Sequence, residues 1–347
     1  MSNQIITYAA ALSRGLVAAM EEDDSIFVTG IAVDYPSGMF GTTIEALKKF
    51  GPERVFDAPA MENAMTGIAI GAAAMGKRPV IIHPRADFLF LALDQLINLG
   101  AKWSYMFGGN AGRVPIVIRA VIGKGWGQGG THSQSLHSII SHFPGIHVSL
   151  PSDSESAMNL TYTALKNNTP TVIFEHRSLF DFESYVPERP QELEIGKAKV
   201  LRNGNDITII ATSFMTRECL KAADTLSTYN ISAEVIDLQW VRPLDENTIL
   251  KSLKKTGRLI ATDVTWELNG TASEVCALVA EQAFDYLKSP VRRICQANSP
   301  APVSQPLERS FYPTANTIVK AAGNIFGVQN IGEISSAVPG DQFKGPY

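Results

Sequence analysis

Segments with strand character and segments with helical spacing alternate along almost the whole chain of 347 residues. Short apolar runs at 25–30, 78–84 and 114–123 predict buried strands, and apolar residues at helical spacing predict helices at 8–23 and 42–51. Strands that alternate with helices in this way usually lie parallel to one another in one sheet. The order therefore predicts an α/β protein whose parallel sheet is covered by helices on both faces.

The alternation is interrupted once. Residues 177–200 are rich in proline and charge and show little helical period, which predicts a linker. The pattern then restarts at 205 with a strand and continues as a second, smaller α/β unit, and the last twenty residues have no period at all. We therefore expect a first domain at 1–185, a linker at 186–203, a second domain at 204–326 and a flexible tail at 327–347.

Charge and composition exclude several classes of protein. A net charge of −4 and a pI near 5.9 give no electrostatic footprint for DNA or RNA. No run of about 18 apolar residues predicts a membrane span, and the first 15 residues do not have the pattern of a secretory signal. Cys219, Cys276 and Cys295 lie far apart without a CxxC motif, so we expect buried thiols in a reducing, cytoplasmic setting.

The glycine-rich segment 123–135 is the first candidate for chemistry, because the common phosphate-loop, zinc and serine-hydrolase motifs are absent. It either carries the backbone close to a ligand and presents His132, or it is a long surface connection; the residues favour neither. His132, His137, His142 and His147 follow at a spacing of five. Neighbours on a helical face are three or four apart, so we expect no metal cluster.

Glu62 is the only charged residue in the segment 58–76, which otherwise predicts a helix that is apolar on all sides and therefore buried. A helix N-terminus favours a carboxylate by roughly 0.3–1 kcal/mol. Deep burial opposes the charge by about 3–5 pKa units, or roughly 4–7 kcal/mol. A buried carboxyl at this place would share a proton near neutrality. The alternative, slightly favoured by the residues alone, is a glutamate that faces water, and Phe88 and Phe90 in the next helix are expected to be core residues.

Several motifs, taken in order, resemble one family. They are MENAMTGIAIGAA, ADFLFLALDQLINLGAKW, VPIVIR, HSQS followed by FPGIHVSLPSDSESA, EVIDLQWVRPLDENTI and AFDYLKSPVRRI. Together, over roughly residues 5–326, they resemble the beta subunit of the first, thiamin diphosphate-dependent component of 2-oxo acid dehydrogenase complexes, of which pyruvate, branched-chain and acetoin dehydrogenases are examples. Transketolase carries a related half. The resemblance implies a pyrimidine-binding domain followed by a transketolase C-terminal-like domain.

The resemblance also implies roles for individual residues. Glu62 matches the glutamate that hydrogen-bonds a pyrimidine ring nitrogen of thiamin diphosphate, so that the cofactor's amino group can form the imine that generates the ylid. Phe88 matches the ring that packs on the pyrimidine, and Met61 is expected to contact the cofactor beside Glu62. His132 matches the active-site histidine of the HSQ motif, which acts in a substrate step. His83, Arg85 and Gln134 are the candidates for the substrate side.

One family motif is missing. The GDG sequence that holds the diphosphate through Mg²⁺ does not occur in this chain. The resemblance therefore implies half of an active site, an alpha subunit in an α2β2 heterotetramer, and Mg²⁺ bound by that partner with no metal held by this chain. The chain departs from the family pattern at His83 and Arg85, in the glycine-rich loop and in the tail. These departures bear on which substrate is used and on whether the chain docks to a lipoyl-bearing acyltransferase.

The sequence thus predicts a beta subunit of a thiamin diphosphate-dependent 2-oxo acid dehydrogenase that acts on a small 2-oxo acid. Two alternatives remain at this stage. One is the beta half of a split transketolase-like carboligase, which passes the carbon fragment to an aldehyde or sugar. The other is a non-catalytic interaction subunit, against which the retention of Glu62 argues.

Overall fold

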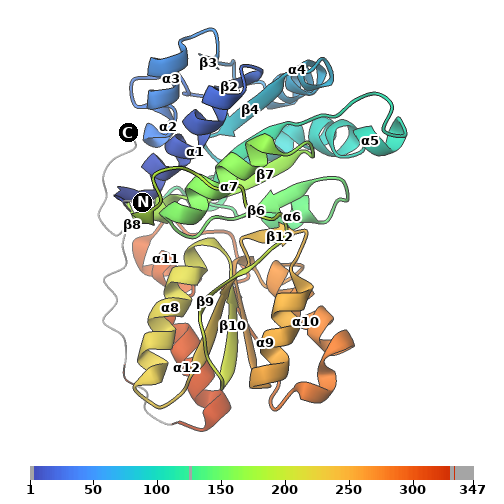
Figure 1. Cartoon of the computed structure of the whole chain (residues 1–347). Helices are drawn as coiled ribbons and strands as arrows, with labels where there is room; N and C mark the ends of the chain where they lie inside the picture. The colour runs from blue at the N-terminus through green and yellow to red at the C-terminus, as the bar shows by residue number, and fades with distance from the viewer. Residues whose placement is uncertain (1–3, 125–126, 329–331, 333–347) are drawn as a thin grey trace. The chain divides into compact units, whose positions relative to one another are not determined.

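The computed structural model describes residues 4–124, 127–328 and 332 (Figure 1). The chain divides into two compact units. Among the described residues, the first unit comprises 4–124 and 131–195, and the second comprises 127–130, 196–328 and 332. The domain boundaries expected at 185 and 203 remain predictions.

A parallel sheet forms the centre of the first unit, with the strand order β6-β7-β5-β4-β2-β3. All residues of β5 and β7 are buried. Strands buried on both faces have nearly continuous apolar sequences, which is why these runs were predictable. The strands are β2 (Ile26–Gly30), β3 (Val55–Asp57), β4 (Arg78–His83), β5 (Val117–Ile122), β6 (His147–Ser149) and β7 (Thr171–His176).

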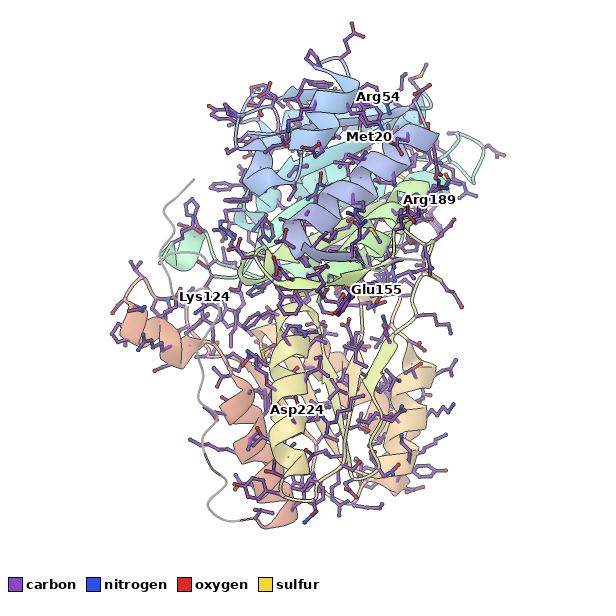
Figure 2. The ribbon with its side chains drawn as sticks, turned by 60° about the vertical axis from the view of Figure 1, so that its left-hand side comes forward. Met20, Arg54, Lys124, Glu155, Arg189 and Asp224 are labelled. Atoms are coloured by element: carbon purple, nitrogen blue, oxygen red, sulfur yellow. The ribbon has the colours of Figure 1, made fainter. Side chains whose placement is uncertain are left out.

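Helices α1 and α7 pack closely together in this unit. Gly15 in α1 permits the approach, because a Cβ atom there would lie 2.4 Å from the carbonyl oxygen of Met158. Arg54, just before β3, donates to the carbonyl of Met20 at the end of α1 over 3.1 Å; both residues are labelled in Figure 2. The helices are α1 (Tyr8–Glu22), α2 (Gly38–Gly41), α3 (Ile44–Phe50), α4 (Glu62–Ala74), α5 (Trp103–Met106), α6 (His137–Ser141), α7 (Ser154–Lys166) and the 3-10 turn η4 (Arg177–Leu179).

Two details of the first unit differ from expectation. The helix expected around Phe88 and Phe90 is irregular, because residues 86–107 form the 3-10 helix η1 (Ala86–Ala92), the π-helix η2 (Asp94–Gly100) and α5. Strands β1 (Gln4–Thr7) and β8 (Glu183–Val186) pair antiparallel although neither has a strand signal of its own. Both are short and partly exposed, so neither needs the continuous apolar run that marks a buried strand.

A five-stranded sheet with the order β14-β13-β10-β11-β9 forms the second unit. Helices α8 and α12 lie on one side of it and α9 and α10 on the other (Figure 1). Ile210, Ile236, Leu253 and Val275 belong to the buried core between the sheet and the latter pair. The elements are β9 (Lys199–Arg202), β10 (Ile207–Ala211), α8 (Ser213–Ser227), β11 (Ala233–Asp237), β12 (Trp240–Arg242), α9 (Glu246–Thr256), β13 (Leu259–Trp266), α10 (Thr271–Gln282), η5 (Phe284–Tyr286), β14 (Arg292–Gln296), α11 (Gln305–Phe311) and α12 (Ala315–Phe326).

Strand β9 lies within the expected linker 186–203 and pairs antiparallel with β11. It is a half-exposed edge strand, and its polar composition resembles that of a linker. The expected tail at 327–347 begins directly after α12, and most of it lies outside the described residues.

The three cysteines differ in how deeply they are buried. Cys219 is buried as expected, whereas Cys276 and Cys295 are only half-buried, so that expectation was wrong for these two. They lie on α10 and on the outermost strand β14, where the sheet ends. Among the described residues, no helix has the length and apolarity that crossing a bilayer requires.

Candidate functional site

Glu62 is the first residue of α4, directly after the turn that leaves β3. Its side chain is buried, with 6% of the residue exposed. No hydrogen bond or ion pair reaches its carboxylate from any residue that the structure describes. Buried carboxylates are normally paired or hydrogen-bonded because desolvation is costly. The Glu62 carboxylate is therefore free to bind a group that this part of the chain does not supply.

Helix α4 is not buried on all sides, so that prediction was wrong. One face, which includes Met65, Ala69 and Ala73, packs on its own unit. The opposite face exposes Met61 by 56%, Ile68 by 74% and Met75 by 85%. The sequence shows that this second face is apolar but cannot show whether the same chain covers it. Large exposed apolar side chains in a continuous patch mark a contact surface.

Phe88 and His132 lie together although 44 positions separate them in the sequence. Their ring centroids are 5.3 Å apart at an interplanar angle of 74°, an edge-to-face contact. Phe88 lies in η1 and is 37% exposed, and Phe90 in the same helix is 41% exposed, so neither is the core residue that helical spacing predicted. His132 is half-buried, and its Nδ1 lies 3.0 Å from Thr131 Oγ1.

Gln134 connects the same two segments. Its Nε2 donates to Asp87 Oδ1 over 2.8 Å, and its backbone N–H donates to the same oxygen over 3.4 Å. Asp87 is 9% exposed and directly precedes Phe88. The sequence analysis did not identify Asp87, because nothing in the local pattern indicates that an acid in η1 reaches a residue 47 positions later.

His83 ends β4 and is fully buried. Neither of its ring nitrogens has a hydrogen-bond partner among the described residues. Burial lowers the pKa of His83 to about 4, so the imidazole is neutral at pH 7. Arg85, two residues further, is 3% exposed and donates from Nη1 to the carbonyl of Gly123 over 3.2 Å.

His176 and Lys124 are two further residues at this edge that the sequence analysis did not identify. His176 ends β7 and packs on Gly123, where a Cβ atom would lie 2.2 Å from its Nε2 and where φ is +77°. Burial, together with the charges of Lys124 and Arg85, lowers the pKa of His176 to about 3. Lys124 itself is 9% exposed. The available signal was topological: β4, β5 and β7 are neighbouring parallel strands, so residues that follow them gather at one edge.

The structure thus brings some of the predicted residues together. Phe88 contacts His132, and Asp87 beside Phe88 holds Gln134. Helix α4 packs on η1, where Asn63 donates to the carbonyl of Leu91 over 3.3 Å. Met61 is exposed, so its contact with a cofactor stays a prediction. Among the described residues, no group of three or more His, Cys, Asp or Glu side chains is arranged to hold a metal ion.

Two family models match the chain. The pyrimidine binding domain of transketolase matches residues 4–182, and the C-terminal domain of transketolase matches residues 196–318. A solved structure described as a split gene transketolase, in the form of an inactive beta4 tetramer, superposes with a TM-score of 0.75 at 24% identity over 94% of this chain and 99% of that one.

Two curated relatives are more similar in sequence. One is the mitochondrial pyruvate dehydrogenase E1 component subunit beta-2 of Oryza sativa subsp. japonica, 40% identical over 91% of this chain and 85% of the relative. The other is the acetoin:2,6-dichlorophenolindophenol oxidoreductase subunit beta of Bacillus subtilis, 35% identical over 93% of this chain and 98% of the relative.

The fold and the domain matches define a protein of the transketolase class, with a pyrimidine-binding domain and a C-terminal domain, as predicted. The relatives narrow this class. The chain belongs to the family of E1 beta subunits of pyruvate and acetoin dehydrogenases, and the resemblance inferred from its motifs is confirmed.

Proposed function

We propose that this chain is the pyrimidine-side half of a thiamin diphosphate-dependent 2-oxo acid dehydrogenase. The observation that carries the proposal is the buried, unpartnered carboxylate of Glu62 at the start of an uncharged helix. A carboxyl in such a place can exchange a proton with a weakly basic ring nitrogen. The name of the rice relative, a pyruvate dehydrogenase E1 component subunit, supports a 2-oxo acid as the substrate. Acetoin, which the name of the Bacillus subtilis relative refers to, is a hydroxyketone without a carboxyl group, so that name supports related carbon–carbon cleavage but not decarboxylation.

The residues present fit the pyrimidine end of the cofactor. Glu62 offers a buried carboxyl that can hydrogen-bond a ring nitrogen, and Phe88 offers a half-exposed ring on which a flat heterocycle can pack. Thiamin diphosphate, when bound, supplies the carbanion chemistry that allows a 2-oxo acid to lose carbon dioxide. In this proposal the Met61 side chain lies beside the cofactor.

The substrate side is assigned to residues that lie near Phe88 in sequence or in space. His132 contacts Phe88 and is half-buried, so it can reach a substrate and transfer a proton in a later step. His83, Arg85 and Gln134 are the further candidates. His83 is neutral at pH 7, so it acts as a hydrogen-bonding group and not as a cation.

A partner is part of the proposal. An alpha subunit supplies the site for the diphosphate and its Mg²⁺, because the GDG motif is absent here. The exposed apolar face of α4 supports a contact with a second chain in an α2β2 heterotetramer. The structural neighbour's description as a beta4 tetramer supports assembly for a chain of this fold. We also propose that the acceptor of the acyl group is a lipoyl-bearing acyltransferase. The proposed location of the assembly is the cytoplasm, whereas the rice relative is described as mitochondrial.

The test is Glu62→Gln, assayed after co-expression with the alpha-type partner. The variant removes the exchangeable proton but keeps the size of the side chain. We expect decarboxylation of 2-oxo acids to fall about 10²–10⁴-fold, with an unchanged melting temperature. Glu45→Gln is the matched control, since Glu45 also lies in the first turn of a helix but is exposed and pairs with Lys48. Near-normal turnover of Glu62→Gln would refute the role.

The acceptor is tested with the same assembly. Lipoamide and a panel of short aldehydes or sugars are offered separately with each 2-oxo acid that is decarboxylated. Reduction of lipoamide supports the dehydrogenase. Carbon–carbon bond formation with an aldehyde and no reaction with lipoamide would favour the split carboligase instead.

A further inference from the structure

His132 lies in a segment without regular secondary structure. The 3-10 turn η3 (Gly129–Thr131) precedes it and α6 begins at His137, so no helix or strand hydrogen bonds fix residues 132–136. A histidine that meets a substrate must nevertheless be held in one orientation, because small misplacements of a reacting group cost large factors in rate. The contacts of this segment with η1 are the means by which the structure holds it.

Two of these contacts meet at one atom. The Gln134 side chain and backbone N–H both point to Asp87 Oδ1, over 2.8 and 3.4 Å. The shorter bond runs from a neutral donor to a carboxylate that is 9% exposed. Hydrogen bonds to an ionised acceptor are stronger than neutral ones, and water competes little for a buried acceptor. The Asp87–Gln134 pair is therefore a strong directional link between the segment and η1.

The position of this link in the chain gives it its effect. Asp87 is the neighbour of Phe88, and Gln134 lies two residues after His132. The hydrogen bond thus joins the residue beside the Phe88 ring to the irregular segment that carries the His132 ring. The centroids of the two rings lie 5.3 Å apart at an interplanar angle of 74°, and Thr131 Oγ1 contacts His132 Nδ1 over 3.0 Å.

We infer that Asp87 is a positioning residue that holds His132 against Phe88 through Gln134. The inference rests on the proposed function for the catalytic role of His132, but the geometric claim can be tested without it. Asp94, in the next helical segment, offers the contrast. It is exposed, and among the described residues it accepts side-chain hydrogen bonds only from Gln95 and Asn98 in its own segment.

The Asp87 carboxylate also explains why an acid is used and not an amide. Its second oxygen, Oδ2, is buried and has no hydrogen-bond partner among the described residues. An amide placed here would bury an N–H group without an acceptor, which is costly. A carboxylate presents only acceptors. The burial of its unpartnered Oδ2 also costs free energy, and the stronger hydrogen bond that the charge accepts from Gln134 offsets part of this cost.

The experiment measures the orientation of His132 in the full chain by NMR, with ¹³C-labelled histidine. The edge-to-face contact with Phe88 displaces the carbon-bound ring protons of His132 by ring current, and His132→Gln assigns the signal. Phe88→Leu removes the aromatic ring, so the chemical shift of His132 in this variant is the reference for zero displacement. We expect Asp87→Ala to lose at least half of the displacement, while Asp94→Ala retains it. Full retention in Asp87→Ala would overturn the inference.

A charge swap keeps the test decisive if Asp87→Ala does not fold. Gln134→Glu puts two carboxylates against each other and should lose the displacement. Asp87→Asn combined with Gln134→Glu restores one hydrogen bond with the donor and acceptor exchanged, and should recover at least half of it. If the double variant shows no larger displacement than Gln134→Glu alone, the positioning role of Asp87 is contradicted.

Turnover of the assembled enzyme separates this inference from the proposed function. We expect Asp87→Ala to lower kcat about tenfold with a smaller change in KM, and the double variant to recover most of the loss relative to Gln134→Glu. Suppose that Glu62→Gln stays active and that the NMR displacement is lost in Asp87→Ala. The proposed function then fails, and the positioning role of Asp87 stands. If Glu62→Gln is inactive and the displacement is fully retained in Asp87→Ala, only the positioning role of Asp87 fails.

Discussion

At the scale of single residues, the burial of His83 and His176 makes the stability of the protein depend on pH. Burial lowers the pKa of His83 to about 4 and that of His176 to about 3, below the value of 6.5 for a free histidine. The folded state thus binds fewer protons than the unfolded state in this range. The stability is fully present above about pH 6.5 and is lost as the pH falls toward the folded pKa values.

The prediction for His83 follows from this sign. Between pH 7 and 5 the wild-type chain should lose about 2 kcal/mol of unfolding free energy through His83 alone. His83→Leu should remove that part of the slope in urea unfolding measured at each pH. His142→Asn, at an exposed position, is the control and should leave the slope unchanged. An identical slope in His83→Leu and wild type would contradict the prediction.

His132→Ala tests the other end of the same site. The side chain lies on the substrate side of Phe88 in the proposed function and makes no contact with Glu62 in the described residues. We expect the assembled variant to bind thiamin diphosphate with unchanged affinity and to turn over about 10²-fold more slowly, the lower end of what general acid–base groups contribute. Calorimetry gives the first quantity and a steady-state assay the second; an unchanged rate would count against the role.

At the scale of elements, strands β5 and β7 carry a buried ion pair on the face where Arg119 and Glu175 point. The two side chains are 1% and 0% exposed, and Arg119 donates from Nε and Nη2 to the two oxygens of Glu175. Removing one partner leaves an uncompensated charge inside the sheet. We therefore expect Glu175→Gln to cost about 3–5 kcal/mol in chemical denaturation. The double replacement Arg119→Met with Glu175→Leu should cost less, because it leaves no buried charge.

The elements also show what the sequence could and could not predict. Strand β5 was predictable because both of its faces are buried and all of its residues except the paired Arg119 are therefore apolar. Strands β1, β8 and β9 were missed because each is four residues long, partly exposed, and defined by its pairing with a distant segment. Pairing between distant segments leaves little trace in the local pattern.

The site divides in the same way. Glu62 was identified because a lone charge in an apolar helix is unusual, and Phe88 and His132 were assigned through the family motifs. Asp87 and His176 were missed because their importance depends on which segments the fold brings to them, Gln134 in one case and Gly123 in the other. A single sequence does not contain that proximity.

At the scale of the whole molecule, the outer face of α4 is the proposed contact surface for the alpha subunit. Ile68 is 74% exposed at the middle of this face, so Ile68→Glu removes no contact within the chain and should change its stability by less than about 0.5 kcal/mol. If the face binds the alpha subunit, the same change buries an unpaired charge in the interface and should weaken assembly at least 100-fold. Phe284→Glu, at a position 68% exposed in the second unit, is the matched control.

The measurements are light scattering on co-expressed subunits and calorimetry with thiamin diphosphate and Mg²⁺. Because the chain lacks a diphosphate motif, wild type alone and Ile68→Glu with its partner should both bind the cofactor weakly, whereas wild type and Phe284→Glu with the partner should bind it tightly. In the proposed function, Glu62 and Phe88 contact only the pyrimidine ring, and the partner supplies the site for the diphosphate and Mg²⁺. Tight binding by the isolated chain would show that the site is complete without a partner, and normal assembly of Ile68→Glu would move the interface away from α4.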